Sequence, residues 1–385
     1  MRGRALYSIV LILSSAACVD RVFIDVGSGA AFGIVIDGHI SDQPGPYRIE
    51  INSGHDLENR FDRHPISVKR LVLSDDEGTK EVLTEVNEGV YQTKPTGIRG
   101  TVGRVYTLHI ETFDVRFYES IPDTLFPPGR VDSIYYSFKE FKTPDNASNY
   151  GFNVLFDASA GLKNNYHFLW KFTGTFQADT HPELCLDPMH PCEPCTNDFR
   201  CNQCSICNIA PFCSGLRNVG SVRAPVYIRV GPCECCTCWY NLYNPTPILS
   251  DNQYLQLGRF IGVTAYFVPL NQWIFQHKVH VDVSQMSLSR QAFAFWKAVK
   301  DQQNAINSLF QPVTGKIPNN FVQLSGMQAP IAGLFFATAI SSKMKFITRD
   351  DVPNPSVIPP VSIGWNQSCL TLFPHSTTTK PAFWD

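Results

Sequence analysis

Short segments in which apolar and polar residues alternate dominate the first third of the sequence. In residues 105–111, Tyr, Leu and Ile would face one side of a strand while Thr, His and Glu face the other, and residues 47–52 alternate in the same way. This period of two predicts half-buried β-strands. Residues 75–78 (Asp-Asp-Glu-Gly) are typical of a hairpin turn, so residues 66–74 and 80–86 are expected to pair.

The strand-like segments recur about every ten residues and predict two β-rich units. The first, residues 31–122, is expected to form a small immunoglobulin- or transthyretin-like β-sandwich. A stiff junction with two adjacent prolines follows at residues 121–129. Residues 123–385 are expected to form a larger β-rich domain, whose strand-like segments are 131–141, 150–157, 166–176, 254–268, 278–283 and 329–340. The predicted fold class is therefore mainly β.

One segment has helical spacing instead. Ser289 is a favourable N-cap residue. Apolar residues then recur at i, i+3, i+4 and i+7, at Ala292, Phe295, Trp296 and Val299. These positions predict one main helix over residues 289–303. Because an aromatic stripe at helical spacing is usually core, we expect Trp296 to be packed, with a carbohydrate contact as the alternative.

The N-terminus has the order of an export signal. A basic start at Arg2 and Arg4 precedes an apolar run at residues 5–13 and four small residues that end at Cys18. The run is far shorter than the ~20 residues that span a bilayer. We expect residues 1–17 to be a signal peptide, Cys18 to be lipidated, and residues 18–30 to be a tether.

The lipidation motif departs from its common form, because Ser15 stands where leucine is usual three residues before the cysteine. Plain secretion is the alternative, since the small residues up to Ala17 also fit an ordinary cleavage site.

Composition and motifs narrow the function classes. Hydrophobic residues make up 44% of the chain, charged residues 17%, and the formal net charge is −2, without a block of Lys or Arg. No nucleic-acid partner is expected from this charge pattern. The sequence has no G-x-S-x-G, H-E-x-x-H, P-loop or G-x-G-x-x-G motif. We therefore expect a non-enzymatic protein with no catalytic residues and no cofactor.

Cysteines are the densest chemical feature. Besides Cys18 and Cys369, all of them lie in an insert at residues 179–239: Cys185, Cys192, Cys195, Cys201, Cys204, Cys207, Cys213, Cys233, Cys235, Cys236 and Cys238. An exported protein meets an oxidising compartment, and a loop with little apolar core gains from cross-links. We expect the insert to be oxidised, with Cys369 pairing into it or close to it.

Metal binding and redox chemistry are the alternatives for the same insert. Two C-x-x-C pairs have the spacing of a four-thiolate zinc site: Cys192, Cys195, Cys204 and Cys207. A C-x-x-C redox site is also open, although no thioredoxin-like βαβ pattern surrounds these pairs.

Ordered short motifs resemble a known family over nearly the whole mature chain. In the first half they are Val35-Ile-Asp-Gly38, Gly45-Pro-Tyr47, Gly89-Val-Tyr91 and Gly103-Arg-Val-Tyr106. In the second half they include Cys238-Trp239, Leu257-Gly258, Val268-Pro-Leu270, Ser287-Leu-Ser289, Phe295-Trp296, Ser308-Leu-Phe310, Gly315-Lys-Ile-Pro318, Gly333-Leu-Phe335, Ala337 and Lys380-Pro-Ala-Phe-Trp384. The chain resembles the Bacteroidota cell-envelope lipoprotein family known as domain-of-unknown-function family 4249.

The resemblance implies an outer-membrane lipoprotein, often encoded beside a TonB-dependent transporter. It carries over no catalytic or binding residue, and the dense cysteine insert departs from it. We therefore expect a lipid-anchored protein exposed on the cell surface that captures ligand for, or contacts, a TonB-dependent outer-membrane transporter. Two alternatives are a zinc-binding or redox-active module and an envelope hydrolase with a dispersed site.

Overall fold

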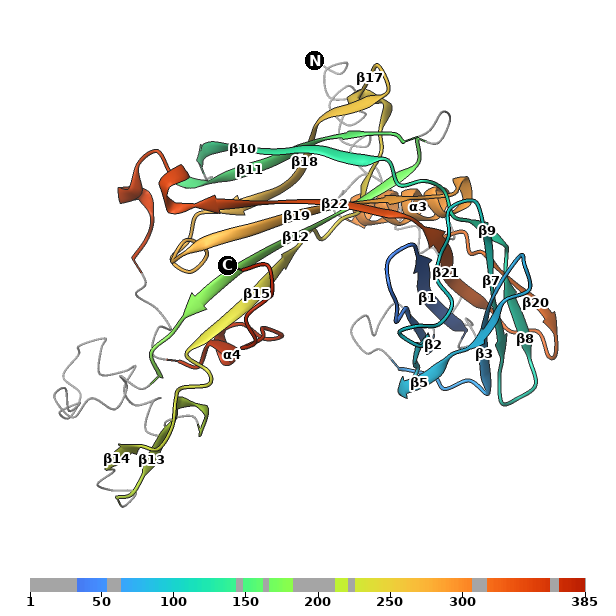
Figure 1. The fold of residues 1–385 in the computed structure, drawn as a ribbon, viewed down its shortest axis with the longest axis horizontal. Helices are drawn as coiled ribbons and strands as arrows, with labels where there is room; N and C mark the ends of the chain where they lie inside the picture. Colours follow the sequence, from blue (N-terminus) through green and yellow to red (C-terminus); the bar gives the residue numbers. More distant parts are fainter. Residues whose placement is uncertain are drawn as a thin grey trace, which may run out of the picture.

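The computed structural model describes residues 33–53, 64–142, 148–161, 166–182, 212–220, 226–306, 317–360 and 367–384. The predicted signal peptide, Cys18 and the tether lie outside these ranges. The fold is mainly β, as the alternating pattern predicted, with two sandwiches and a projecting arm (Figure 1). No helix within the described ranges is long and apolar enough to cross a bilayer.

The first sandwich consists of two sheets. One has the order β21 (Ile331–Thr338), β1 (Ile34–Ser41), β2 (Arg48–Ser53), β6 (Val90–Gln92), β5 (Thr84–Asn87). The other has the order β20 (Phe321–Ser325), β8 (Phe117–Ser120), β7 (Val105–Glu111), β3 (Arg70–Asp75), β4 (Lys80–Val82), and β9 (Asp123–Thr124) pairs with β7. Alternate residues point between the sheets: Tyr106, Leu108 and Ile110 are buried, as the periodicity predicted.

The first sandwich takes two of its strands from the other end of the chain. Strand β21 runs parallel to β1 from the pair Ile34 and Ile331, and β20 pairs with β8. Residues 34–124 therefore supply most of this sandwich, while residues 321–338 supply one outer strand to each sheet.

The second sandwich is larger and has longer strands than the first (Figure 1). One sheet has the order β10 (Arg130–Lys142), β11 (Ser148–Ser159), β18 (Arg259–Pro269), β17 (Leu255–Gln256). The other has the order β15 (Thr237–Tyr243), β12 (Phe168–Asp179), β19 (Lys278–Ser287), β22 (Ile340–Thr348), and β16 (Ile248–Leu249) pairs with β12. Their inner faces meet in an aromatic core in which Trp170 contacts Phe156 and Phe260 edge-on, with ring centroids 5.1 Å apart in each pair.

Three features join the sandwiches. The strand expected within residues 329–340 is β21, and the chain passes from it into β22 of the second sandwich with only Ala339 between them. The junction is held by hydrogen bonds, since Ser287 Oγ donates to Phe126 O at 2.6 Å and Gln285 Nε2 donates to Pro128 O at 2.5 Å. Helix α3 (Arg290–Ile306) packs against both units through β12, β16 and β21.

Helix α3 confirms the predicted helix and its start. Ser289 Oγ accepts a hydrogen bond from Ala292 N at 3.1 Å, the N-cap arrangement that its sequence position predicted. The remaining short elements are η2 (Phe212–Ser214), β13 (Leu216–Asn218), β14 (Tyr227–Arg229), η3 (Asn252–Tyr254), η4 (Arg349–Asp351), η5 (Pro355–Val357) and α4 (Cys369–Leu372).

Candidate contact surface

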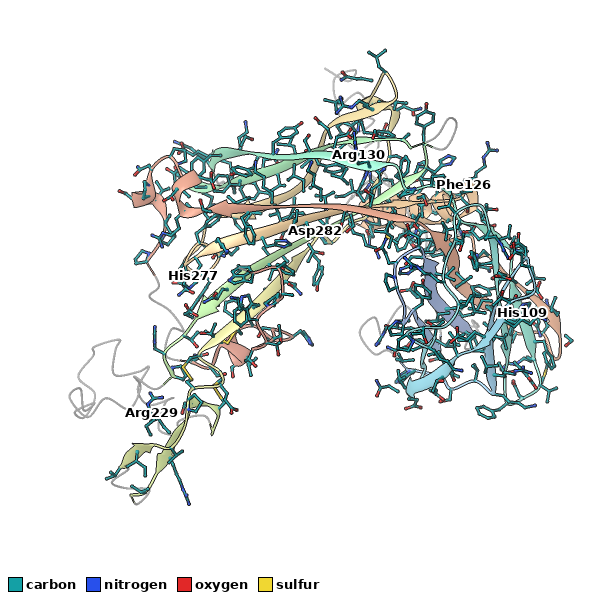
Figure 2. The ribbon with its side chains drawn as sticks, in the orientation of Figure 1. His109, Phe126, Arg130, Arg229, His277 and Asp282 are labelled. Atoms are coloured by element: carbon teal, nitrogen blue, oxygen red, sulfur yellow. A yellow bond between two sulfur atoms is a disulfide. The ribbon has the colours of Figure 1, made fainter. Side chains whose placement is uncertain are left out.

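The arm at the end of the second sandwich is a β-hairpin. Strands β13 and β14 pair antiparallel from Leu216 with Arg229 to Asn218 with Tyr227, and Val219 N extends the ladder to Val226 O at 2.7 Å. Figure 2 shows Arg229 on this hairpin, far from the body of the molecule. Within the described residues, the hairpin is a sheet of two strands.

Aliphatic side chains are exposed on this hairpin. Val226, Ile228 and Val230 occupy every second position of one strand and therefore share one face. They are 55%, 46% and 60% exposed, and Val219 is 55% exposed. A two-stranded hairpin is marginal on its own and gains little stability by holding aliphatic groups in water. This face, Val226, Ile228 and Val230, is called the aliphatic face below.

Disulfides fix the base of the arm. Cys213 is joined to Cys235, Cys233 to Cys236, and Cys238 of β15 to Cys369 of α4. Cys369 is thus bonded to the insert, where the sequence placed its partner. Backbone bonds add to the cross-links: Glu234 N donates to Cys213 O at 2.7 Å. The hairpin is held by covalent bonds where a small element lacks a core.

A carboxylate lies where the cysteine-rich insert leaves the second sandwich. At the end of β12, Asp179 accepts hydrogen bonds from Thr237 Oγ1 at 2.8 Å and from Gln177 Nε2 at 3.1 Å, and lies 2.5 Å from His277 Nε2. Burial raises the pKa of Asp179, but the hydrogen bonds from His277, Gln177 and Thr237 lower it further than burial raises it. Figure 2 shows His277 near this end of the sheet.

The C-terminal segment docks on the same sheet. Thr377 exchanges two backbone hydrogen bonds with Trp239 of β15. Trp384, which is 5% exposed, donates its indole N–H to Gln177 Oε1 at 2.9 Å, and Phe383 stacks on His280 with centroids 4.0 Å apart. The segment that ends the chain therefore braces the sheet from which the arm projects.

The other predicted cysteine sites lie outside the described residues. Besides Cys18, these are Cys185, Cys192, Cys195, Cys201, Cys204 and Cys207. The four proposed zinc ligands are among them, so the zinc alternative stays a prediction. Within the described ranges, no group of three or more His, Cys, Asp or Glu side chains has a metal-binding arrangement.

A cavity of about 380 Å³ lies beside α3. Trp296 and Val299 of the helix line it together with Leu169 and Lys171 of β12 and Tyr243 of β15. Its volume is in the range of about 300–1,000 Å³ that small-molecule pockets occupy. Trp296 also packs, partly buried, against the apolar cluster under α3. Its predicted packing is observed, and the carbohydrate alternative for its exposed side stays a prediction.

A serine, a histidine and a carboxylate are aligned on the outer face of the first sandwich. Ser74 Oγ lies 2.8 Å from His109 Nε2, and His109 Nδ1 lies 3.0 Å from Glu119 Oε2. They come from β3, β7 and β8, and Figure 2 shows His109 within this sheet. Sequence motifs missed them because triads are recognised by geometry and not by local spacing.

The aliphatic face did leave a signal in the sequence. Residues 226–230 read Val-Tyr-Ile-Arg-Val, which alternates with the period of a strand. The dense cysteines around this segment favour an interpretation as a cross-linked loop and obscure the alternation.

The family model described as "Domain of unknown function (DUF4249)" matches residues 20–344. No curated protein and no solved structure matches the chain.

Proposed function

Because the chain belongs to the domain-of-unknown-function family 4249, as the match over most of its length shows, we propose that it is a lipid-anchored protein of the outer membrane. In this proposal it is exposed on the cell surface, works by contact and catalyses no reaction. Its partner is a TonB-dependent outer-membrane transporter, and the acyl chain is carried by Cys18.

The aliphatic face is the observation that carries this proposal. It is presented by a hairpin whose base is tied by Cys213–Cys235, Cys233–Cys236 and Cys238–Cys369. Exposed aliphatic side chains on a stiff projection favour burial against another protein. Because cross-links hold the base before contact, less conformational entropy is lost on binding.

The anchor supports contact with a membrane partner for a separate reason. A protein held in the same bilayer as its partner meets it at a high effective concentration, so a small contact suffices. A two-stranded hairpin offers a smaller contact than the ~800 Å² per partner of a standard interface. A contact of that size is enough when both proteins are held in the same membrane.

The test is affinity purification of the protein from mild detergent. The triple variant Val226→Asp, Ile228→Asp and Val230→Asp should lose a co-purifying transporter at least about tenfold, since charges on the aliphatic face would have to be desolvated. Leu257→Asp is the matched control, because Leu257 is fully exposed on the turn between β17 and β18. A transporter retained equally by the triple variant, or absent from every sample, contradicts the proposal.

A hydrolase is the second candidate, and the alignment of Ser74, His109 and Glu119 favours it. Here Ser74 Oγ would attack an ester carbonyl while His109 Nε2 takes the hydroxyl proton, and Glu119 would hold the imidazole at Nδ1. His109 would return the proton to the leaving alkoxide, and water would then release the acyl group and regenerate the serine. Within the described part of the chain, none of the cavities beside α3 includes these residues.

Covalent labelling separates the two candidates. A fluorophosphonate probe should label the wild-type protein and not Ser74→Ala if Ser74 is a nucleophile, while His109→Gln should lower the labelling rate by orders of magnitude. Equal labelling of wild type and Ser74→Ala excludes this site.

A further inference from the structure

Two loop tips at the free end of the first sandwich expose large apolar side chains. The loop between β7 and β8 carries Phe113, 69% exposed, and Val115, 59% exposed. Leu324, 60% exposed, lies near the end of β20, and Met327, 84% exposed, lies in the loop that joins β20 to β21. These four residues are called the apolar tips below. Single exposed apolar residues are common on surfaces, whereas four at one end of a molecule need an explanation.

The two loops lie against each other. Strands β8 and β20 are hydrogen-bonded partners, with Ser325 opposite Phe117. At Gly326, a Cβ atom would lie 2.9 Å from Val115 O and 2.8 Å from Arg116 Cγ, so only glycine allows this approach. The two loops that carry the apolar tips are therefore adjacent.

Hydrogen bonds hold both loops in shape. Thr112 Oγ1 accepts from Arg116 N at 3.0 Å. In the other loop, Gln323 Nε2 donates to Met327 O at 2.8 Å while Gln323 Oε1 accepts from Ala329 N at 3.1 Å. The side chains are presented to solvent by braced turns, and collapse onto the sandwich would break these bonds.

Val115 adds a second observation. Its φ is 62°, in the left-handed region that a β-branched residue rarely adopts. Glycine or asparagine would relieve the strain, and the exposed valine gains no burial within the chain to offset it. Strained backbone of this kind concentrates at functional sites. The charged side chains of the same loop are paired with each other, since Asp114 lies 2.6 Å from Arg116.

The chain enters the described structure beside this surface. Gly33 is its first described residue, and the next residue, Ile34, donates its N–H to Pro330 O at 3.1 Å, at the end of the loop that carries Met327. The segment between Cys18 and Gly33 therefore joins the fold at the end that carries the apolar tips. The β13–β14 hairpin lies at the opposite extremity of the molecule (Figure 1).

We propose that the apolar tips are a membrane-contacting surface whose occupant is the lipid bilayer. Phe113, Val115, Leu324 and Met327 enter the interfacial layer next to the tether, as apolar groups do to a depth of about 5–10 Å. The proposal rests on the proposed lipid anchor and adds a second point of attachment. Two points fix the orientation of the first sandwich, which a single tether does not.

Fluorescence depth measurement tests this directly. The mature chain from Val19, carrying an N-terminal His tag in place of the acyl group, is bound to vesicles of phosphatidylethanolamine and phosphatidylglycerol doped with nickel-chelating lipid. Phe113→Trp should show a blue-shifted emission that brominated lipid quenches, measured as the difference from the wild-type protein. Leu257→Trp is the matched control, since Leu257 is exposed on the other sandwich and also has a positive φ of 49°.

Quenching at position 113 without quenching at position 257 supports the surface. No quenching at position 113, or equal quenching at both positions, overturns it. Because the His tag replaces the lipid, this result does not depend on acylation of Cys18, which the mass of the N-terminal peptide reports separately. If position 113 is quenched and the N-terminal peptide carries no acyl group, the lipid anchor is refuted and the membrane-contacting surface is still supported.

Discussion

The first sandwich and the cysteine-bonded arm keep their shape by different means. The sandwich encloses a cluster of fully buried side chains that includes Ile49, Leu73, Leu108 and Phe335, and no disulfide joins its described residues. The arm has exposed aliphatic residues and three cross-links at its base. Burial of apolar area stabilises the first, whereas the second relies on covalent constraint. Because the arm is not held together by a buried core, its apolar side chains can be exposed to a partner.

The largest expected effect is at Phe335, a fully buried residue of β21. Phe335→Ala should lower the free energy of unfolding of the first sandwich by about 3–5 kcal/mol, because it removes buried contacts and leaves a cavity. Urea denaturation measures the change. Phe113→Ala, at a mostly exposed phenylalanine, should stay within about 0.5 kcal/mol of wild type. An equal loss in both variants would contradict the core assignment.

The next effect is at the cross-link between Cys238 and Cys369. The double variant Cys238→Ala and Cys369→Ala should cost about 2–4 kcal/mol, since this bond closes a long loop. Limited proteolysis should cleave the arm faster while the first sandwich stays protected. Replacing Cys233 and Cys236, which are three residues apart, should cost less. If both double variants behave alike, loop closure is not the source of the stability.

A smaller effect is expected at the start of α3. Ser289→Ala removes the oxygen that accepts from Ala292 N and should cost about 1 kcal/mol. Ser289→Asp should retain most of the stability, because aspartate is also a good N-cap. Thermal unfolding followed by circular dichroism distinguishes the two, and a neutral alanine variant would show that packing alone sets the helix start.

The smallest effect is pH-dependent and local to the root of the arm. The pKa of Asp179 is lowered in the folded protein from its ordinary 3.8, so its contribution to stability is present above that value and is lost as the pH falls below it. In the Asp179→Asn variant, less stability should be lost as the pH falls. The docking of Trp384, followed by tryptophan emission on acidification, reports it. Asp114→Asn, whose carboxyl pairs with Arg116 at the other end of the molecule, should leave the emission unchanged.

Much of the fold could be predicted from local pattern. The alternation at residues 105–111 assigned the buried side of β7, and the spacing from Ser289 predicted α3 together with its N-cap. Partner strands could not be predicted, because periodicity reports which side of a strand is buried and not what covers it. Residues 329–340 show this: their apolar run predicted a buried strand, which is β21, but not that it pairs with β1 of the first sandwich.

The candidate surfaces were harder to predict than the fold. The cysteines showed where a constrained element lies, and the bond from Cys369 to the insert followed from their clustering, although Cys238 was not singled out as its partner. Exposed aliphatic residues in the hairpin and at the apolar tips look like core residues in sequence, since hydrophobicity alone does not reveal exposure. The contact between the loops at Val115 and Gly326 depends on two segments far apart in the chain.

The pairing of β1 with β21 has a consequence for the order of folding. Strand β1 forms almost at the start of the described chain, and its parallel neighbour arrives only when residue 331 has been made. At about 5–20 residues per second, synthesis leaves that edge of β1 open for tens of seconds. Pairings so distant in sequence slow folding and expose strand edges to association. Holding the chain unfolded until its last strands are available would remove that hazard, and the export route proposed for this chain would do so.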